Sequence, residues 1–552
     1  MVMTRSAAGG GPPRRRLAGW GFEGESYPPS ESLLQWLTER LGTTVPFPQF
    51  DPSSFQPIEP RALPHLHCRI SQDPMERLAH ARGQGLPDLL RLRAGAVSAL
   101  PDVVAHPGSA REIEQVLNVC GRSEIRVIPW GGGTSVTGAV NVLPSQDSIV
   151  SLDMQGLSTL EDVDVESGLA TFGAGVRGPA LESQLAPYGL TLGHFPQSWE
   201  LSTLGGWIAT RASGQESLAY GGIDRLLAGV EAIAPSGRLE LAAMPSTAAG
   251  PDLRQLLLGS EGRFGVLTRA TVRVRRRPET LHVEALLLPS WERGLEAVRE
   301  MSQARLPLQI VRLSDEPETE VALRAGLADH ALVAPLLRGW IRLRGIRGSG
   351  CLLLCGAAGS VGETEASLDR AAALLRRHGA VALGRRPGNR WLEDRFRHPY
   401  LRDSLLDRGI ATDTLETAAP WSSLSSLARR VRKALESALQ EENEATTVLC
   451  HLSHPYPDGA SLYFTFFFRC PADVGEALAR WGRLKRRATE ALLDAGGTLT
   501  HHHGIGLWHA PWLDREVGST GRKLLEATAR TADPEGILNP QVLLDPVDRL
   551  ET

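Results

Sequence analysis

The chain has 552 residues, of which 42% are hydrophobic and 22% charged, and its formal net charge is −4, from 59 basic and 63 acidic residues. This composition is close to the globular average and excludes a fibrous or disordered protein, while the length favours two or more domains. The near balance of charge gives no strong positive field, so we expect no nucleic-acid partner.

The N-terminal region divides into two parts. Residues 1–16 are rich in Gly, Pro and Arg, which bury little apolar surface, so we expect a disordered tail whose arginines could touch a membrane surface peripherally. Residues 17–98 are expected to form a helical cover. Within this cover, Ser30 predicts the start of a helix that runs to Leu41, because the leucines in this stretch recur at helical spacing.

A strand–helix–strand unit begins after Pro101. Residues 103–105 form the first expected strand and residues 126–129 the second. Between them, Ser109 and Glu112 have the spacing of a capping box, which predicts the start of an amphipathic helix.

Strands then alternate with turn residues to about Val274. The last is an alternating strand over residues 266–275, and Pro235-Ser236-Gly237 is an expected turn before it. This order predicts an α+β domain over residues 99–277. From 278 to 500 the pattern is mixed, with a helical block over 368–377 and an aromatic strand over 462–468, which we interpret as a second, substrate-covering domain.

A glycine-rich loop follows the second strand directly. It consists of Pro129, Trp130, Gly131, Gly132, Gly133, Thr134 and Ser135. Three consecutive glycines let backbone N–H groups approach an anion, so the loop is typical of a pyrophosphate cradle. It lacks the Lys-Ser/Thr ending of a Walker loop and the G-x-G-x-x-G of a nicotinamide fold. Taken alone, it could equally be a flexible turn.

Two further segments share this make-up of small residues and hydroxyl donors. The second comprises Gln197, Ser198, Trp199, Glu200, Leu201, Ser202 and Thr203, followed by Thr210, Arg211, Ala212 and Ser213. The third comprises Glu261, Gly262, Arg263, Phe264, Gly265, Val266 and Leu267. Three such loops are hard to explain as unrelated turns, and a long cofactor lying against the backbone would need all of them.

In order and spacing, these loops resemble the FAD domain of the vanillyl-alcohol-oxidase flavoprotein superfamily. The resemblance implies that they hold the pyrophosphate, ribityl chain and isoalloxazine of FAD. It also implies an α+β fold with a two-subdomain PCMH-type FAD-binding domain, followed by a cap domain with an antiparallel sheet and flanking helices. Residues 501–552 would complete the active site. The glycine loop has no histidine for a covalent tether, so we expect noncovalent FAD.

Further motifs narrow the resemblance to the alkyl-dihydroxyacetonephosphate synthase family. They are Gly19-Trp20-Gly21-Phe22, Val311-Arg312-Leu313, Tyr400-Leu401-Arg402-Asp403, Ala419-Pro420-Trp421, Tyr456, Gly459 to Phe464, and His501-His502-His503-Gly504-Ile505-Gly506. The similarity runs from residue 17 to Leu544. Related 2-hydroxyacid dehydrogenases usually have Glu-His-Gly where this chain has its histidine triplet, which makes the triplet the most telling feature.

The resemblance also implies a reaction and its residues. The acyl group of acyl-dihydroxyacetonephosphate would be replaced by a fatty alcohol, with no net electron transfer. Tyr463 would act as general acid/base, with its phenol pKa tuned below the usual value of about 10 by the histidines. Arg402 would bind the substrate phosphate and Arg312 would help to order the flavin site.

Each of these residues also has a plainer interpretation. Tyr463 lies in a phenylalanine-rich strand, where an aromatic side chain is more often part of the core. Arg402 could pair with Asp403 or Glu393 at the surface. The histidine triplet could suggest a metal, but adjacent residues of an extended chain point to opposite faces, so we expect a polar cage and no metal.

Two rival functions share the FAD loops. One is an FAD-dependent oxidoreductase that oxidises a hydroxyacid or alcohol, and the other is a flavoprotein without turnover. For the cellular context, six cysteines without C-x-x-C spacing favour reduced thiols, and no run of about 18 apolar residues occurs. We therefore expect a cytoplasmic protein, at most peripheral to a membrane. The resemblance implies small lipid substrates, acyl-dihydroxyacetonephosphate and a fatty alcohol, and we also expect a homodimer.

Overall fold

The computed structural model describes residues 14–327, 333–346, 348–545 and 550. Most of the expected tail lies outside these residues. Its last part differs from the expectation, because Arg15 pairs with Phe22 in a short antiparallel bridge. The Arg15 guanidinium donates a 2.5 Å hydrogen bond to the carbonyl of Gly132, and that of Arg16 donates to the carbonyl of Glu25. Arg15 and Arg16 of the expected tail therefore contact the rest of the protein.

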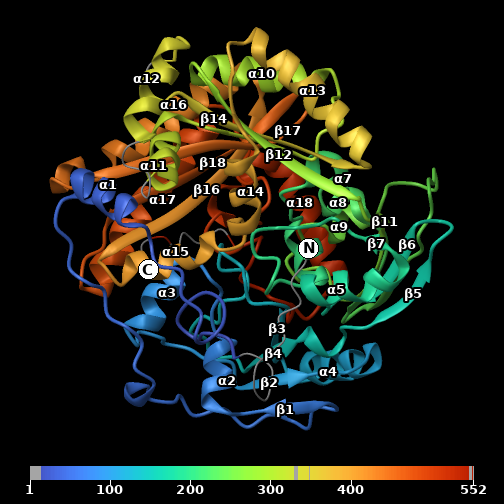
Figure 1. Ribbon diagram of the computed structural model, residues 1–552. Coiled ribbons are helices and arrows are strands. Elements are labelled where there is room, and N and C mark those ends of the chain that lie inside the picture. Colours follow the sequence, from blue (N-terminus) through green and yellow to red (C-terminus); the bar gives the residue numbers. More distant parts are fainter. Residues whose placement is uncertain (1–13, 328–332, 347, 546–549, 551–552) are drawn as a thin grey trace.

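The first subdomain of the FAD region is a four-stranded sheet at the bottom of Figure 1. Its order is β1 (Arg69–Ser71), β2 (Val103–His106), β4 (Ile149–Asp153) and β3 (Arg126–Trp130), with the last three parallel. The helix α4 (Ala110–Arg122) connects β2 to β3, as expected. Ser109 caps it, but Glu112 accepts from the N–H of Gly108 instead of completing the capping box.

The second subdomain is an antiparallel five-stranded sheet. Its order is β5 (Leu160–Asp164), β6 (Leu169–Gly173), β10 (Val266–Arg273), β8 (Leu227–Ala234) and β9 (Gly237–Leu241). The alternating strand thus ends at Arg273, and β11 (Arg275–Arg276) pairs separately with β7 (Leu190–Thr191). The expected turn lies between β8 and β9. The helices here are α5 (Gly178–Leu185), α6 (Leu204–Thr210), α7 (Ser217–Tyr220), α8 (Ile223–Leu226) and α9 (Arg254–Leu257).

The cap domain is built on an antiparallel seven-stranded sheet. Its order is β15 (Val381–Gly384), β12 (Thr280–Leu288), β14 (Cys351–Gly359), β13 (Ile310–Ser314), β17 (Thr446–Pro455), β18 (Gly459–Arg469) and β16 (Ile410–Pro420). The helices α10 (Trp291–Gln303), α13 (Val361–Arg377) and α16 (Trp421–Ser437) lie along its outer side, at the top of Figure 1.

The remaining helices fill the space between the sheets and around their edges. They are α1 (Glu31–Leu41), α2 (Pro74–Ala79), α3 (Leu86–Arg93), α11 (Glu316–Leu327), α12 (Val333–Leu343), α14 (Arg385–Asp394), α15 (His398–Leu406), α17 (Val474–Asp494) and α18 (Leu513–Ala532). The helix α1 begins after Ser30 and ends at Leu41, as the sequence predicts. The C-terminal segment returns to the FAD region, where Leu538 forms a parallel bridge with Val127.

The aromatic strand β18 separates the core from the site. Phe464, Phe466 and Phe468 alternate toward a large buried cluster that includes apolar residues of α16 and α17. Tyr463, Thr465 and Phe467 face the opposite side of the sheet, because successive side chains of a strand point to opposite faces. The same alternation that builds the core therefore presents Tyr463 to the FAD region.

Candidate active site

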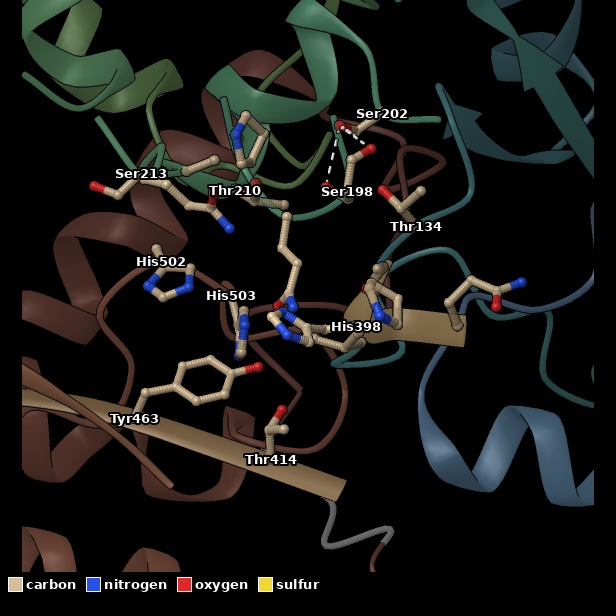
Figure 2. A pocket seen from close by; sticks show the side chains of 18 of the residues that line it. Thr134, Ser198, Ser202, Thr210, Ser213, His398, Thr414, Tyr463, His502 and His503 are labelled. Atoms are coloured by element: carbon tan, nitrogen blue, oxygen red, sulfur yellow. Dashed lines mark hydrogen bonds between the residues drawn. The ribbon is translucent and has the colours of Figure 1, made fainter. Parts of the chain in front are cut away.

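A cavity of about 650 Å³ lies between the FAD region and the cap sheet. It is lined by all seven residues of the glycine loop, and by Gln197, Ser198, Ser202, Thr203, Thr210, Ala212, Ser213, Glu261, Gly262, Gly265, Val266 and Leu267. The cap domain contributes Arg312, Arg402 and Tyr463, and the C-terminal region contributes His502 and His503. Figure 2 shows hydroxyls of the FAD loops on one side of the space and Tyr463 with Thr414 on the other.

Some residues of the expected FAD loops do not line this cavity. Trp199, Leu201 and Phe264 are buried among apolar side chains, and Trp199 stacks on Phe396. Arg211 ends α6 in the left-handed region at φ 55°, and Arg263 donates to the carbonyl of Leu538. Glu200 and His501 are likewise outside the lining. The loops therefore contribute through their small and hydroxyl residues, and their large side chains anchor them.

The first and second loops interlock at two glycines. A Cβ on Gly132 would stand 2.1 Å from the carbonyl oxygen of Leu201, and one on Gly131 would stand 2.4 Å from the Thr203 hydroxyl. Both contacts are shorter than any real Cβ contact, so only glycine fits. The loops thus form a narrow backbone cradle, and Trp130 Nε1 in the cavity wall is a buried donor without a protein partner among the described residues. These features fit a bound FAD, whose phosphate oxygens accept from backbone and ring N–H groups.

The third loop joins the FAD region to the histidine triplet. The carboxylate oxygens of Glu261 accept from the N–H of Gly506 at 3.0 and 2.8 Å. A Cβ on Gly504 would stand 2.4 Å from this carboxylate, so the chain after the triplet needs glycine there. Burial raises the pKa of Glu261 to about 8, although hydrogen bonds from Gly506 and Ile505 oppose the change.

Tyr463 lies at the centre of the cap wall. On its two neighbouring strands its direct partners are His451 of β17 and Glu416 of β16, and the His451 ring stacks on it at 5.0 Å between centroids. Burial raises the pKa of Tyr463 to about 12, against the lowering influence of a hydrogen bond to Thr414 and the charge of Arg312. The expectation of a phenol tuned below its usual pKa is therefore wrong for this state of the site, because desolvation outweighs the stabilisation of the phenolate.

Arg312 belongs to a buried charge network beside Tyr463. It donates to Glu318 at 2.8 Å and to Nε2 of His451 at 2.8 Å, while Nδ1 of His451 lies 3.2 Å from Glu318, to which it can donate. Burial acts to raise the pKa of Glu318, but attraction to His451 and Arg312 outweighs it, so this pKa lies well below the usual range. The pKa of His451 is lowered, by burial first and then by Arg312. The network therefore consists of a cation, an anion and a neutral imidazole.

The histidine triplet is held through its backbone. Glu416 accepts from the N–H of His501 at 2.5 Å, from those of His502 and His503 at 3.1 Å each, and from the Thr500 hydroxyl at 2.7 Å. Burial lowers the pKa of each of the three histidines to about 4. Figure 2 shows His502 and His503 turned toward the cavity beside Tyr463, which supports the expected polar cage.

Arg402 reaches the cavity from α15 on the other side. Its guanidinium donates to the carbonyl of Gln84 and, at 3.2 Å, to the Gln84 amide oxygen. Its Nε lies 3.7 Å from a carboxylate oxygen of Asp403 and is buried without a hydrogen-bond partner among the described residues. Arg402 lines the cavity, so its guanidinium can attract an anionic ligand there.

One part of the cavity is apolar. Its lining includes Leu33 of α1, Val321, Ala322 and Ala325 of α11, Leu401 of α15, Leu449 of β17 and Phe467 of β18. Leu33, Leu449 and Phe467 belong to one buried cluster, on which Val321 and Leu401 pack. The cavity therefore combines a polar end at the FAD loops with an apolar wall that can accommodate a hydrocarbon chain.

Several residues of the site escaped the sequence analysis. They are His194, Glu318, His398, Glu416, His451 and His454, all close to or part of the cavity wall. His451 and Glu416 share the face of Tyr463 because of the pairing register, which no local sequence signal specifies. The even spacing of Thr412, Thr414 and Glu416 along one strand was the one available signal for Glu416.

Comparisons with known proteins agree with this geometry. Residues 101–242 match the family described as FAD binding domain, and residues 277–543 match FAD linked oxidases, C-terminal domain. The alkyldihydroxyacetonephosphate synthase of Trypanosoma brucei brucei is 34% identical, with 86% of this chain and 78% of the relative covered. The alkyldihydroxyacetonephosphate synthase of Dictyostelium discoideum is 30% identical, with 87% of this chain and 79% of the relative covered. A solved alkyldihydroxyacetonephosphate synthase structure superposes with a TM-score of 0.81 at 26% identity, over 96% of this chain and 98% of the other.

Proposed function

The chain belongs to the alkyldihydroxyacetonephosphate synthase family, and from that premise we propose that it exchanges the acyl group of acyl-dihydroxyacetonephosphate for a fatty alcohol. The products are an alkyl ether of dihydroxyacetonephosphate and a free fatty acid. FAD is the cofactor of the protein, and the substrates of the protein are small lipid molecules. The matches over 101–242 and 277–543 support an FAD domain over 99–277 followed by a cap domain that begins at 278. The proposed division also has a cover over 17–98, an end of the cap domain at 500 and a C-terminal region over 501–552.

One observation carries the proposal. A single cavity is lined both by the three FAD loops and by Arg312, Arg402, Tyr463 and two histidines of the triplet. Bound FAD, held by the three loops, would supply an isoalloxazine ring able to hold the dihydroxyacetone carbon during the exchange. The protein has to place the phosphate, the hydrocarbon chain and a proton-transfer group around that ring, and each task has matching residues in the cavity wall.

Tyr463 is the proposed proton-transfer group. With its pKa raised to about 12, the phenol is protonated at neutral pH and can give its proton to a substrate atom in the cavity. Arg312, whose charge favours the phenolate, stabilises the anion that is left. The neutral rings of His502 and His503, 6.3 and 5.9 Å from the tyrosine ring, can take part in returning the proton.

The two ends of the substrate have separate binding groups. Arg402 lines the cavity, and a guanidinium is well suited to a phosphate dianion. The apolar wall of α1, α11 and β18 suits the acyl or alkyl chain, because burying each CH₂ group contributes about 0.8 kcal/mol. An unphosphorylated or short-chain analogue should therefore bind weakly.

The test is a turnover experiment under anaerobic conditions. The purified yellow protein is incubated with palmitoyl-dihydroxyacetonephosphate and labelled hexadecanol, without an electron acceptor. The proposal requires labelled ether and free palmitate in equal amounts, with the flavin oxidised before and after. If a hydroxyacid or alcohol alone bleaches the flavin and no ether forms, the chain is an oxidoreductase of the same fold.

The proposal includes noncovalent FAD, a homodimer and a cytoplasmic location with at most a peripheral membrane contact. The glycine loop, which lacks a histidine, supports noncovalent binding. Among the described residues, every helix is too short or too polar to cross a bilayer. Acid precipitation tests the first part, since the flavin should stay in solution. Light scattering and cell fractionation test the others.

A further inference from the structure

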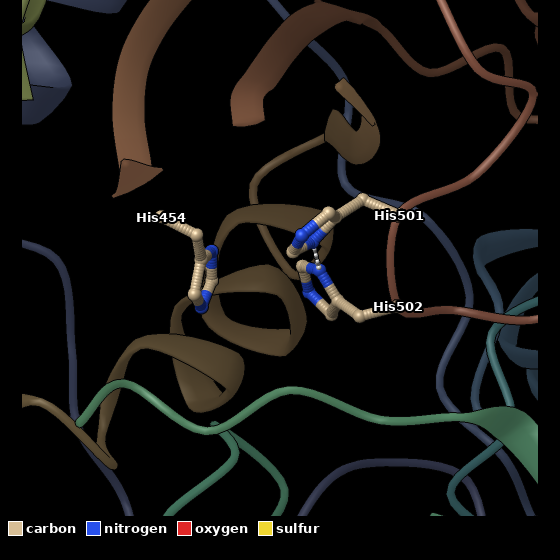
Figure 3. Close-up of side chains that lie close together, drawn as sticks. All are labelled: His454, His501 and His502. Carbon is tan, nitrogen blue, oxygen red and sulfur yellow. Dashed lines mark hydrogen bonds between the residues drawn. The ribbon is translucent and has the colours of Figure 1, made fainter. Parts of the chain in front are cut away.

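Three imidazoles from two distant segments meet beside the cavity. His454 comes from the end of β17, and His501 and His502 come from the histidine triplet. One ring nitrogen of each lies within 4.8 Å of one from both others. Figure 3 shows the His454 ring facing the pair formed by His501 and His502. We call these three residues the imidazole cluster.

The imidazole cluster does not require all three histidines of the triplet to face one metal ion. Three successive histidines cannot all turn toward one ion, because neighbouring side chains diverge. Here only two of them converge, with Nδ1 atoms 2.9 Å apart, while the His503 ring packs against Tyr463 and His502. The third nitrogen donor is His454, which sequence spacing could not reveal because it lies 47 residues earlier.

The outer contacts of two rings resemble those of metal-binding histidines. A ligating imidazole usually uses its other nitrogen to hydrogen-bond a carbonyl or another polar group, which fixes the tautomer. Nε2 of His454 lies 3.2 Å from the Gly214 carbonyl, to which it can donate, so Nδ1 carries the free lone pair. The Ser453 and Ser461 hydroxyls now contact Nδ1 at 2.8 and 3.0 Å and must turn away when an ion binds there. Nε2 of His501 is 2.7 Å from the Tyr456 hydroxyl, which leaves its Nδ1 beside His502.

The donor set selects the kind of ion. Three neutral imidazoles suit Zn²⁺, Cu²⁺ or Ni²⁺, whereas Mg²⁺ and Ca²⁺ require oxygen ligands. A Zn–N bond of about 2.1 Å requires the nitrogens to be about 3.4 Å apart. The His501 and His502 Nδ1 atoms, 2.9 Å apart, must therefore separate slightly, while the more distant nitrogens, up to 4.8 Å apart, must move closer together. His454 and His502 line the cavity, so a fourth position of the ion would open toward the substrate space.

We propose that the imidazole cluster binds one divalent transition-metal ion, best matched by Zn²⁺, and that the bound ion reversibly inhibits turnover. Binding itself is independent of the proposed function. The inhibition rests on that function, because the ion would occupy the nitrogen lone pair of His502, whose ring lies parallel to that of Tyr463, and would block proton return.

The first test is calorimetric titration of the FAD-loaded protein with ZnCl₂. We expect one ion per chain, and His454→Gln should weaken binding by about a hundredfold or more, since it removes a ligand. His67→Gln is the matched control. His65 and His67 form an exposed ring pair 5.0 Å apart that could hold zinc adventitiously, so loss of the tight site in this variant would overturn the proposal.

A second variant guards against misfolding. His501→Asn removes a different ligand, and the flavin spectrum reports whether each variant keeps its FAD. Unchanged zinc binding in both folded variants, or no stoichiometric binding by the parent protein, would contradict the inference. Zinc binding without ether synthesis would count against the proposed function alone. Ether synthesis that zinc leaves unaffected, despite stoichiometric binding, would refute the inhibition.

Discussion

Glu416 and Tyr463 lie directly opposite each other on the neighbouring strands β16 and β18. The carboxylate of Glu416 turns to the histidine loop, where it accepts from three consecutive backbone N–H groups. One cross-strand pair thus fixes both the candidate acid/base and the loop that carries its neighbouring imidazoles. The position of His502 and His503 relative to Tyr463 is therefore set by the sheet register.

Tyr463→Phe tests the acid/base role. The change keeps the ring and its stacking on His451 but removes the hydroxyl, so FAD content should persist while turnover falls by about a hundredfold or more. The measurement is the initial rate of ether formation at equal flavin concentration. Tyr188→Phe, at a tyrosine that is 50% exposed, should be without effect. A Tyr463→Phe enzyme with normal turnover would mean that this ring only packs.

Arg402→Ala tests the phosphate contact. Loss of a charge-assisted contact costs about 1.5 to 3 kcal/mol, so the KM for the phosphorylated substrate should rise about ten- to a hundredfold. FAD content should change little. Arg430→Ala, at an exposed position of α16, is the control. If Arg402→Ala loses flavin at unchanged KM, the contacts to Gln84 serve the cofactor site instead.

Gly132→Val tests the interlocked loops. Its Cβ would meet the Leu201 carbonyl at 2.1 Å, so the first two loops must separate and the protein should lose FAD or fail to fold. Absorbance at the flavin band per mole of protein, together with circular dichroism, measures both. Gly362→Ala, where the Cβ would meet open space, is the control. Full FAD occupancy in Gly132→Val would show that the cradle is not required.

Glu416→Gln tests the support of the histidine loop. In the variant an NH₂ group replaces one of the two oxygens that accept from the backbone N–H groups, so a donor faces a donor. The free energy of unfolding should therefore fall by about 1.5 to 3 kcal/mol or more. Turnover should fall as well, because the loop can move away from Tyr463. Urea denaturation and ether synthesis measure the two effects. Glu535→Gln, at an exposed carboxylate, should match the parent protein, and a Glu416→Gln enzyme with normal turnover would argue against the loop's role.

Glu261→Gln tests the buried carboxyl of the third loop. Its folded pKa of about 8 lies above the ordinary value of 4.5, so its contribution to stability is full below pH 4.5 and is lost as the pH rises through 8. Between pH 4.5 and 8, the free energy of unfolding of the parent protein should fall by up to about 1.4 kcal/mol per pH unit relative to that of the variant, which lacks the titrating group. Urea denaturation at several pH values measures this difference. Parallel curves would contradict the raised pKa, and Glu441→Gln is an exposed control.

The sequence by itself determined the parts of the molecule that depend on local chemistry. The glycine triplet, the hydroxyl-rich second loop and the loop from Glu261 to Leu267 predicted an FAD site through the family resemblance that they carry, and close backbone approach explains their glycines. The helix after Ser30, the strand–helix–strand unit and the aromatic strand also followed from caps and periodicity. These signals lie within a few residues of one another.

Only the tertiary structure decided what surrounds Tyr463. His451 and Glu416 reach it through strand register, Arg312 through a further strand, and the triplet through the Glu416 carboxylate, all from segments far apart in the chain. The raised pKa of Tyr463 was likewise beyond the sequence, since burial is a property of the packed cavity wall. The meeting of His454 with the triplet has the same origin, because long-range contacts leave no local pattern in the sequence.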